Sequence, residues 1–151
     1  MEESELARLF DDWASRLLPY MTTITKDRGL AEDALQNLFV KLATSRPDLR
    51  DPGVYLFRAA RNEALRMARR RPGSARALSQ LVAPRDPADP GPDVEGVASA
   101  LKRLPPEQLE VVVLHAFEGL TFQETSQVLS IPPDTAASRY RYALEKLKEL
   151  L

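Results

Sequence analysis

The 151-residue sequence contains no cysteine and only one histidine, His115. Disulfides and thiolate metal sites are therefore excluded. The histidine lies in an apolar run, Val111–Phe117, where a structural role is the usual one. The chain also lacks a Gly-rich phosphate loop and any Ser/His/Asp set with plausible spacing. These absences predict a protein that is not an enzyme and that has no catalytic residue, no metal and no cofactor.

Two further absences concern membranes and overall charge. No apolar run is long enough to span a membrane and no signal peptide opens the chain, which predicts a soluble intracellular protein. The formal net charge of -1 does not by itself indicate a polyanionic partner. The charge is unevenly distributed, however. Residues 44–76 carry nine Arg and three acidic residues, a block of +6 in a chain that is otherwise near-neutral or acidic.

Proline and glycine mark a division of the chain. The stretch Pro72–Asp93 is rich in Pro, Gly, Ala and Asp and has little periodicity, which is typical of a mobile linker. Apolar residues recur at helical spacing on both sides of it. We therefore predict an all-α protein of two small helical domains, residues 1–71 and 94–151, joined by a flexible linker over residues 72–93.

Three helices are expected in the N-terminal domain. The first covers residues 4–25 and should be kinked or divided by Pro19. After a turn at residues 26–29, the second covers residues 30–43 and buries a stripe of apolar residues: Leu30, Ala34, Leu35, Leu38, Phe39 and Leu42. Its outer face is polar, with Glu32, Asp33, Gln36, Asn37 and Lys41. That face is either an ordinary solvated surface or a docking surface for a basic partner.

The third helix, residues 51–71, has Asp51 as its N-cap and Pro52 in its first turn. Its outward face is strongly basic and contains Tyr55, Arg58, Arg61, Asn62, Arg66, Arg69 and Arg70. Arg neutralises phosphates, aromatic rings stack on bases, and Asn can pair with a base edge. The pattern favours binding of single-stranded or melted DNA, and a soluble Arg-rich helix is the alternative.

The C-terminal domain is expected to begin with two helices, residues 94–104 and 106–118, and Gly119 follows as the C′ residue of the second. These helices should point seven apolar residues inward: Val97, Leu101, Leu104, Leu109, Val112, Val113 and Phe117. Thr121 and Glu124 then form a capping box for a short helix that ends near Ser130.

Pro132 and Pro133 open the last helix, which covers residues 133–149. It should bury Ala136, Tyr140, Ala143, Leu144, Leu147 and Leu150. Its other face carries hydroxyl and basic groups: Thr135, Ser138, Arg139, Arg141, Tyr142 and Lys146. A short helix, a tight turn and a longer helix of this kind are typical of a DNA-binding helix-turn-helix. An ordinary helical hairpin with a solvated face is the alternative.

Several runs resemble the bacterial sigma-70 family, in the order in which that family has them. They are LAEDALQNLF at 30–39, YLFRAARNEA at 55–64 with the arginines at 69–71, LPPEQ at 104–108, EGLTFQE at 118–124, SR at 138–139 and ALEKL at 143–147. With two domains and a short linker, the chain is similar to the extracytoplasmic-function (ECF) group.

The resemblance implies a transcription initiation factor of the bacterial cytoplasm that binds core RNA polymerase and promoter DNA, with an anti-sigma factor as a further candidate partner. It implies polymerase-clamp contacts at Asp33, Gln36 and Asn37. It implies contacts with the melted minus-ten element at Tyr55, Arg58, Arg61, Asn62, Arg66 and Arg69, with a flipped-base pocket completed by the 46–51 loop. It implies contacts with the duplex minus-thirty-five element at Thr135, Ser138, Arg139, Arg141, Tyr142 and Lys146.

Some positions differ from the family's usual residues. Asn37 stands where an acid is common, and Thr125 and Ser126 replace an aliphatic residue and Ala. Ala137 and Tyr142 replace residues that are frequently basic, so the recognition helix is less basic than is typical. This leaves open a sigma-like decoy that binds an anti-sigma protein and little DNA. The Arg-rich third helix disfavours the decoy, and a plain helix-turn-helix regulator would leave the match over 30–71 unexplained.

Overall fold

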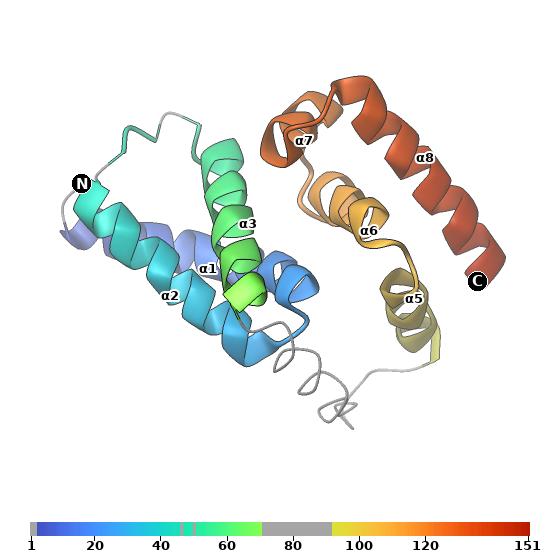
Figure 1. Cartoon of the computed structure of the whole chain (residues 1–151), viewed down its shortest axis with the longest axis horizontal. Coiled ribbons are helices and arrows are strands. Elements are labelled where there is room, and N and C mark those ends of the chain that lie inside the picture. The colour runs from blue at the N-terminus through green and yellow to red at the C-terminus, as the bar shows by residue number, and fades with distance from the viewer. Residues whose placement is uncertain (1–2, 46, 50, 71–91) are drawn as a thin grey trace. The chain divides into compact units, whose positions relative to one another are not determined.

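The computed structural model describes residues 3–45, 47–49, 51–70 and 92–151, and every regular element in these ranges is a helix (Figure 1). The all-α prediction is confirmed. The chain divides into two compact units, residues 1–81 and 82–151. Most of the predicted linker, residues 72–91, lies outside the described residues. None of the described helices is long and apolar enough to cross a membrane.

The first unit contains α1 (Glu3–Thr25), α2 (Arg28–Ser45) and α3 (Pro52–Arg70), which pack against one another. Helix α1 continues through Pro19 as a single element, so the division that we considered there does not occur. Pro19 is exposed, whereas Leu17, Tyr20 and Met21 around it are fully buried. Packing of the buried face therefore maintains the helix across the proline.

Helix α2 begins earlier than predicted, because Arg28 and Gly29 are helical and do not belong to a turn. The backbone N–H of Leu30 donates to Oδ1 of Asp27 at 3.3 Å, so Asp27 caps this helix. All six apolar residues of the predicted stripe are buried, as is Ala31. The prediction of the buried face of α2 is confirmed.

The second unit contains α5 (Pro92–Lys102), α6 (Pro106–Val112), the π-helix η1 (Val113–Phe117), α7 (Phe122–Leu129) and α8 (Pro133–Leu150). Helices α6 and α7 both pack against α8. One core cluster joins Leu104, Val112 and Ala143 with the partly buried Leu101, Leu109, Tyr140 and Leu147.

Three residues predicted to be buried in this unit are exposed: Val97, Phe117 and Leu144. For Phe117 the reason is η1. Residues 106–118 were expected to form one α-helix, but the wider π-turn after Val112 changes the angular position of the residues that follow. For Leu144 the reason is a narrow contact face: Ala136, Tyr140, Ala143 and Leu147 face the core, and Leu144 lies one residue beyond that face.

The start of α7 has the predicted capping box. The side-chain oxygen of Thr121 accepts from the N–H of Glu124 at 3.0 Å, and Oε1 of Glu124 accepts from the N–H of Thr121 at 2.9 Å. At the other end of α7, Ser130 has a left-handed conformation (φ 57°) that ends the helix. Gly119 also has positive φ, 75°, in accordance with its predicted C′ role. The local sequence therefore fixes both ends of α7.

Candidate nucleic-acid interface

Five of the six residues predicted to contact melted DNA share one side of α3. Their spacing of three or four residues places them in a single stripe, which we call the α3 stripe: Tyr55, Arg58, Asn62, Arg66 and Arg69. Arg66 is half-buried and the others are exposed. The sixth residue, Arg61, lies about 100° around the helix from Asn62 and is half-buried. The structure thus combines three cations, a ring and an amide along one line, and places Arg61 at its flank.

The opposite side of α3 is anchored in the core of the first unit. Phe57 is fully buried, and its ring meets those of Trp13 at 6.1 Å and Tyr20 at 5.7 Å in edge-to-face geometry. The Arg16 guanidinium lies 4.3 Å from the centre of the Trp13 ring. Packing of aromatic side chains therefore holds the side of α3 that lies opposite to the α3 stripe.

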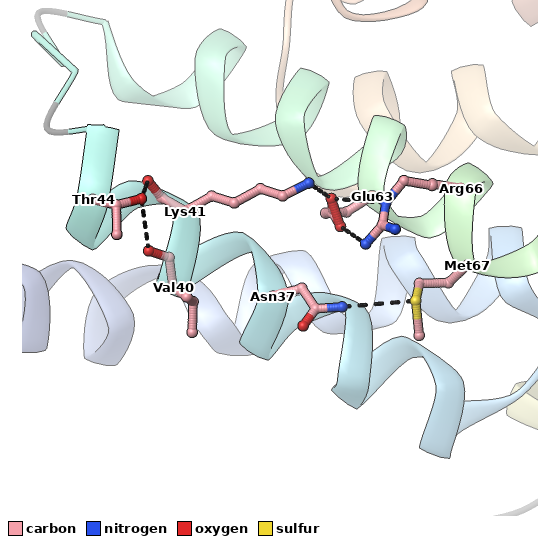
Figure 2. A network of polar contacts seen from close by, with 7 residues as sticks. All are labelled: Asn37, Val40, Lys41, Thr44, Glu63, Arg66 and Met67. Atoms are coloured by element: carbon pink, nitrogen blue, oxygen red, sulfur yellow. Dashed lines mark hydrogen bonds and ion pairs between the residues drawn. The ribbon is translucent and has the colours of Figure 1, made fainter.

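Sequence reasoning missed one residue of this region, Glu63. It is the single acidic residue of α3 and only 4% exposed. Its carboxylate accepts from Nζ of Lys41 on α2, and from Nε and Nη2 of Arg66 at 3.3 and 3.0 Å (Figure 2). Burial alone would raise the pKa of Glu63, but the hydrogen bonds and charges of Arg66 and Lys41 outweigh it and hold the pKa below its usual value. A lone acid within an Arg-rich helix was the signal available in the sequence.

The three predicted polymerase contacts on α2 differ in exposure. Asp33 and Gln36 are exposed. Asn37 is half-buried, and its Nδ2 donates to Sδ of Met67 on α3 at 3.7 Å (Figure 2). Val40, on the same side of the helix, is 63% exposed. This face is therefore open at Asp33, Gln36 and Val40, whereas Asn37 also links α2 to α3.

On α8, five of the six predicted duplex contacts also share one side. Their spacing defines the α8 stripe: Thr135, Ser138, Arg139, Tyr142 and Lys146. Arg141 is off this stripe, about 100° from Tyr142, and its guanidinium lies 5.5 Å from the centre of the Tyr142 ring. Thr135, Ser138 and Arg139 are half-buried, whereas Arg141, Tyr142 and Lys146 are exposed.

The second half of the α8 stripe borders acidic residues. A shallow groove of about 300 Å³ between the start of α6 and α8 is lined by Tyr142 and Lys146 together with Pro105, Gln108, Glu145 and Glu149. The two carboxylates offset the positive charge of Lys146. Thr135, Ser138 and Arg139, in the first turns of α8, do not line this groove.

His115 connects the elements that orient α8. Its Nδ1 is hydrogen-bonded to the carbonyl oxygen of Leu120 at 2.7 Å. Its ring stacks on Phe122 at 4.1 Å and meets Tyr140 edge-to-face at 4.7 Å. These contacts join η1, α7 and α8, which agrees with the structural role expected for His115. In the part of the chain that the structure describes, no group of three acidic or histidine side chains could hold a metal ion.

Comparisons with known proteins cover both units. The family Sigma-70 region 2 matches residues 9–72, and the family Sigma-70, region 4 matches residues 95–147. RNA polymerase sigma factor CarQ of Myxococcus xanthus is 32% identical over 95% of this chain and 87% of its own length. The ECF RNA polymerase sigma factor ShbA of Streptomyces griseus is 29% identical, over 82% of this chain and 72% of its own.

A solved structure shows the same fold. It contains the sigma factor RpoE in complex with the anti-sigma factor NepR from Bartonella quintana. The TM-score is 0.75 at 20% identity, covering 97% of this chain and 96% of that one.

Proposed function

The chain belongs to the sigma-70 family of RNA polymerase sigma factors, in the extracytoplasmic-function group, and we propose that its two units read melted and duplex promoter DNA separately. As a member of this family it directs core RNA polymerase to promoters. Its partners are the polymerase and promoter DNA. Its site is accordingly a binding surface and not a catalytic centre, and its place of action is the bacterial cytoplasm, where polymerase and chromosome meet.

The α3 stripe is the observation that carries the proposal for the first unit. Its arginines neutralise the phosphates of a melted strand, Tyr55 stacks on a base, and Asn62 hydrogen-bonds a base edge of the minus-ten element. Arg61 contributes charge from the flank. On the neighbouring helix, Asp33 and Gln36 dock on the polymerase clamp, with Asn37 at the edge of that contact.

The first half of the α8 stripe carries the proposal for the second unit. A recognition helix enters the major groove by its N-terminal end, which is where Thr135, Ser138 and Arg139 lie. Arg139 and Ser138 are the candidates for base edges of the minus-thirty-five element. Arg141, Tyr142 and Lys146 lie further along α8 and contact phosphates.

Run-off transcription with core polymerase and a promoter library, with and without this chain, tests the function as a whole.

Within the first unit, Asn62→Ala should lower open-complex formation and relax the base preference at one position. Arg58→Ala and Arg61→Ala form a matched pair, because both remove one arginine from α3 but only Arg58 is on the stripe. We expect the larger loss of open complexes for Arg58→Ala, and the thermal unfolding of both variants should be compared with that of the wild type. Normal promoter opening by all three variants would exclude the stripe as the site.

A second candidate function is a decoy that binds an anti-sigma protein and little DNA. The acidic groups Glu145 and Glu149 beside Tyr142 and Lys146 favour it, because they weaken the attraction of α8 for duplex DNA. The solved relative in complex with an anti-sigma factor gives the partner class. An absence of upstream sequence preference in the wild-type holoenzyme would favour this decoy over the initiation factor.

A further inference from the structure

The carboxylate of Glu63 forms ion pairs with two cations from different helices. It is nearly fully buried, and it accepts from Lys41 of α2 and, through both oxygens, from Arg66 of α3 (Figure 2). The two cations are much more exposed than the acid, with 60% of the Lys41 side chain and 42% of the Arg66 side chain accessible. An unpaired buried carboxylate is strongly unfavourable, so Glu63 restrains the exposed side chains that pair with it.

We propose that Glu63 is a positioning residue for DNA binding, which fixes the Arg66 guanidinium on the α3 stripe and joins that stripe to α2. The proposal rests on the proposed function, in which the stripe binds the melted strand. Glu63 engages the edge of the guanidinium formed by Nε and Nη2. The Nη1 donors and the second N–H of Nη2 remain for a phosphate oxygen. An arginine held in this way loses less conformational freedom when it binds than a free one.

The same network links the two proposed binding surfaces of the first unit. Lys41 and Asn37 both lie on α2, one helical turn apart, and both reach α3, at Glu63 and Met67 respectively. Asn37 borders the polymerase-facing residues Asp33 and Gln36. These two contacts hold the polymerase-facing side of α2 and the DNA-facing side of α3 in one arrangement. No sequence motif contains both partners of either contact.

Electrostatics and positioning predict opposite effects for the variant Glu63→Gln. Removing a negative charge next to the α3 stripe should strengthen binding to a polyanion if charge alone matters. Releasing Arg66 should weaken binding if position matters. We expect the second result, with dissociation of DNA about tenfold faster, as is typical for the loss of one charge-assisted hydrogen bond.

The experiment uses holoenzyme made from core polymerase and the full chain. The probe is a fluorescent single-stranded DNA selected by the wild-type holoenzyme from a randomised pool, and the dissociation rate is measured at several salt concentrations. Glu5→Gln, on the exposed start of α1, removes the same charge away from the network and should leave the rate within about twofold of wild type. Tighter or unchanged binding by Glu63→Gln would overturn the proposal.

Arg66→Ala supplies the readout that a merely structural role would not change. If Glu63 acts through Arg66, then Glu63→Gln should have less than about a twofold effect in the Arg66→Ala background. Additive effects would mean that Glu63 only supports the fold, and the proposal would fail.

Should Glu63→Gln not fold, Glu63→Asp replaces it, because Asp keeps the negative charge but its shorter side chain reaches less far toward Arg66. It should accelerate dissociation only when Arg66 is present, and an equal acceleration in both backgrounds would again overturn the proposal. If Asn62→Ala has no effect in the same assay, the proposed function fails and not this inference alone.

Discussion

The stripes on α3 and α8 have the same helical spacing but different chemistry. The α3 stripe combines three arginines with one ring and one amide, and the acid beside it, Glu63, is buried and paired. The α8 stripe combines three hydroxyl groups with Arg139 and Lys146, and exposed carboxylates stand beside Lys146. The first is a surface of concentrated charge, and the second is a surface of hydrogen-bonding groups.

This difference in chemistry indicates a division of work between the two units, in which one supplies most of the affinity for DNA and the other most of the sequence discrimination. Concentrated charge gives affinity that depends steeply on salt and weakly on sequence. Hydrogen-bonding groups in a major groove give discrimination and little affinity of their own. Because the units belong to one chain, binding of one raises the effective concentration of the other, so a weak reader on α8 can still select a site.

The largest expected effect comes from removing charge from the α3 stripe. Arg58→Ala combined with Arg69→Ala should lower the affinity of the holoenzyme for melted DNA about tenfold or more, since two phosphate contacts are lost. The slope of log affinity against log salt should fall by about 1.4, at about 0.7 for each contact with a single strand. Arg141→Ala with Lys146→Ala removes equal charge from α8 and serves as the control. Equal losses of melted-strand affinity for the two pairs would contradict the division of work.

The next effect concerns base readout by α8. Arg139→Ala should relax the preference at one or two upstream positions, because a bidentate arginine discriminates by about 1–3 kcal/mol. Arg141→Ala, off the α8 stripe, should weaken binding to all sequences alike. The measurement is a selection on randomised upstream duplexes with the full chain on core polymerase. An unchanged sequence preference for Arg139→Ala would remove that residue from the readout.

A smaller effect distinguishes the buried polar groups of the two units. Glu63 in the first unit is paired, whereas Oγ1 of Thr125 in the second is buried and has no hydrogen-bond partner among the residues described. Thr125→Val should raise the free energy of unfolding by about 1 kcal/mol, because it removes an unsatisfied hydroxyl and keeps the shape. Calorimetry on the full chain measures this change. Thr125→Ser, which keeps the hydroxyl and removes a methyl group, should destabilise, and a stabilising Ser would refute the explanation.

The smallest expected effect concerns how the stability of the first unit depends on pH in the acid range. The pKa of Glu63 in the folded chain lies below its usual value of 4.5, so its contribution to stability is complete above pH 4.5 and is lost as the pH falls below that value. Glu63→Gln should therefore flatten the loss of stability below pH 4.5. Hydrogen exchange of peptides from α2 and α3, measured at several pH values, reports the local stability of these two helices in the wild type and in the variant. The same acid sensitivity in the Gln variant as in the wild type would rule out Glu63 as its source.

Local sequence signals predicted much of the fold. The capping box at Thr121 and Glu124, the end of α7 at Ser130 and the buried stripe of α2 each depend on residues within one or two helical turns of one another. The α3 stripe follows from the same periodicity. Arg61 and Arg141 lie beside the two stripes, because residues one position apart on a helix diverge by about 100°, and their contacts with DNA stay predictions.

The remaining features depend on long-range packing or on irregular backbone. Glu63 is buried where α3 packs against α2, and its partner Lys41 lies 22 positions earlier, so no local pattern contains that pairing. Phe117 is exposed because the backbone widens into η1, and the apolar pattern there is as compatible with an ordinary α-helix. Pro19 lies inside α1 because buried neighbours outweigh a lost hydrogen bond, which propensity alone does not predict.

The ring stack at His115 has a practical consequence for spectroscopy. His115 is the only histidine of the chain, so its imidazole protons give a single set of NMR signals. Ring currents from Phe122, stacked at 4.1 Å, displace those signals only while η1 and α7 keep their arrangement. The only tryptophan, Trp13, lies in the other unit beside Arg16, where its fluorescence responds to the packing of α1 on α3. Each half of the molecule therefore has its own intrinsic reporter, and the unfolding of the two halves can be followed separately in the unlabelled wild-type chain.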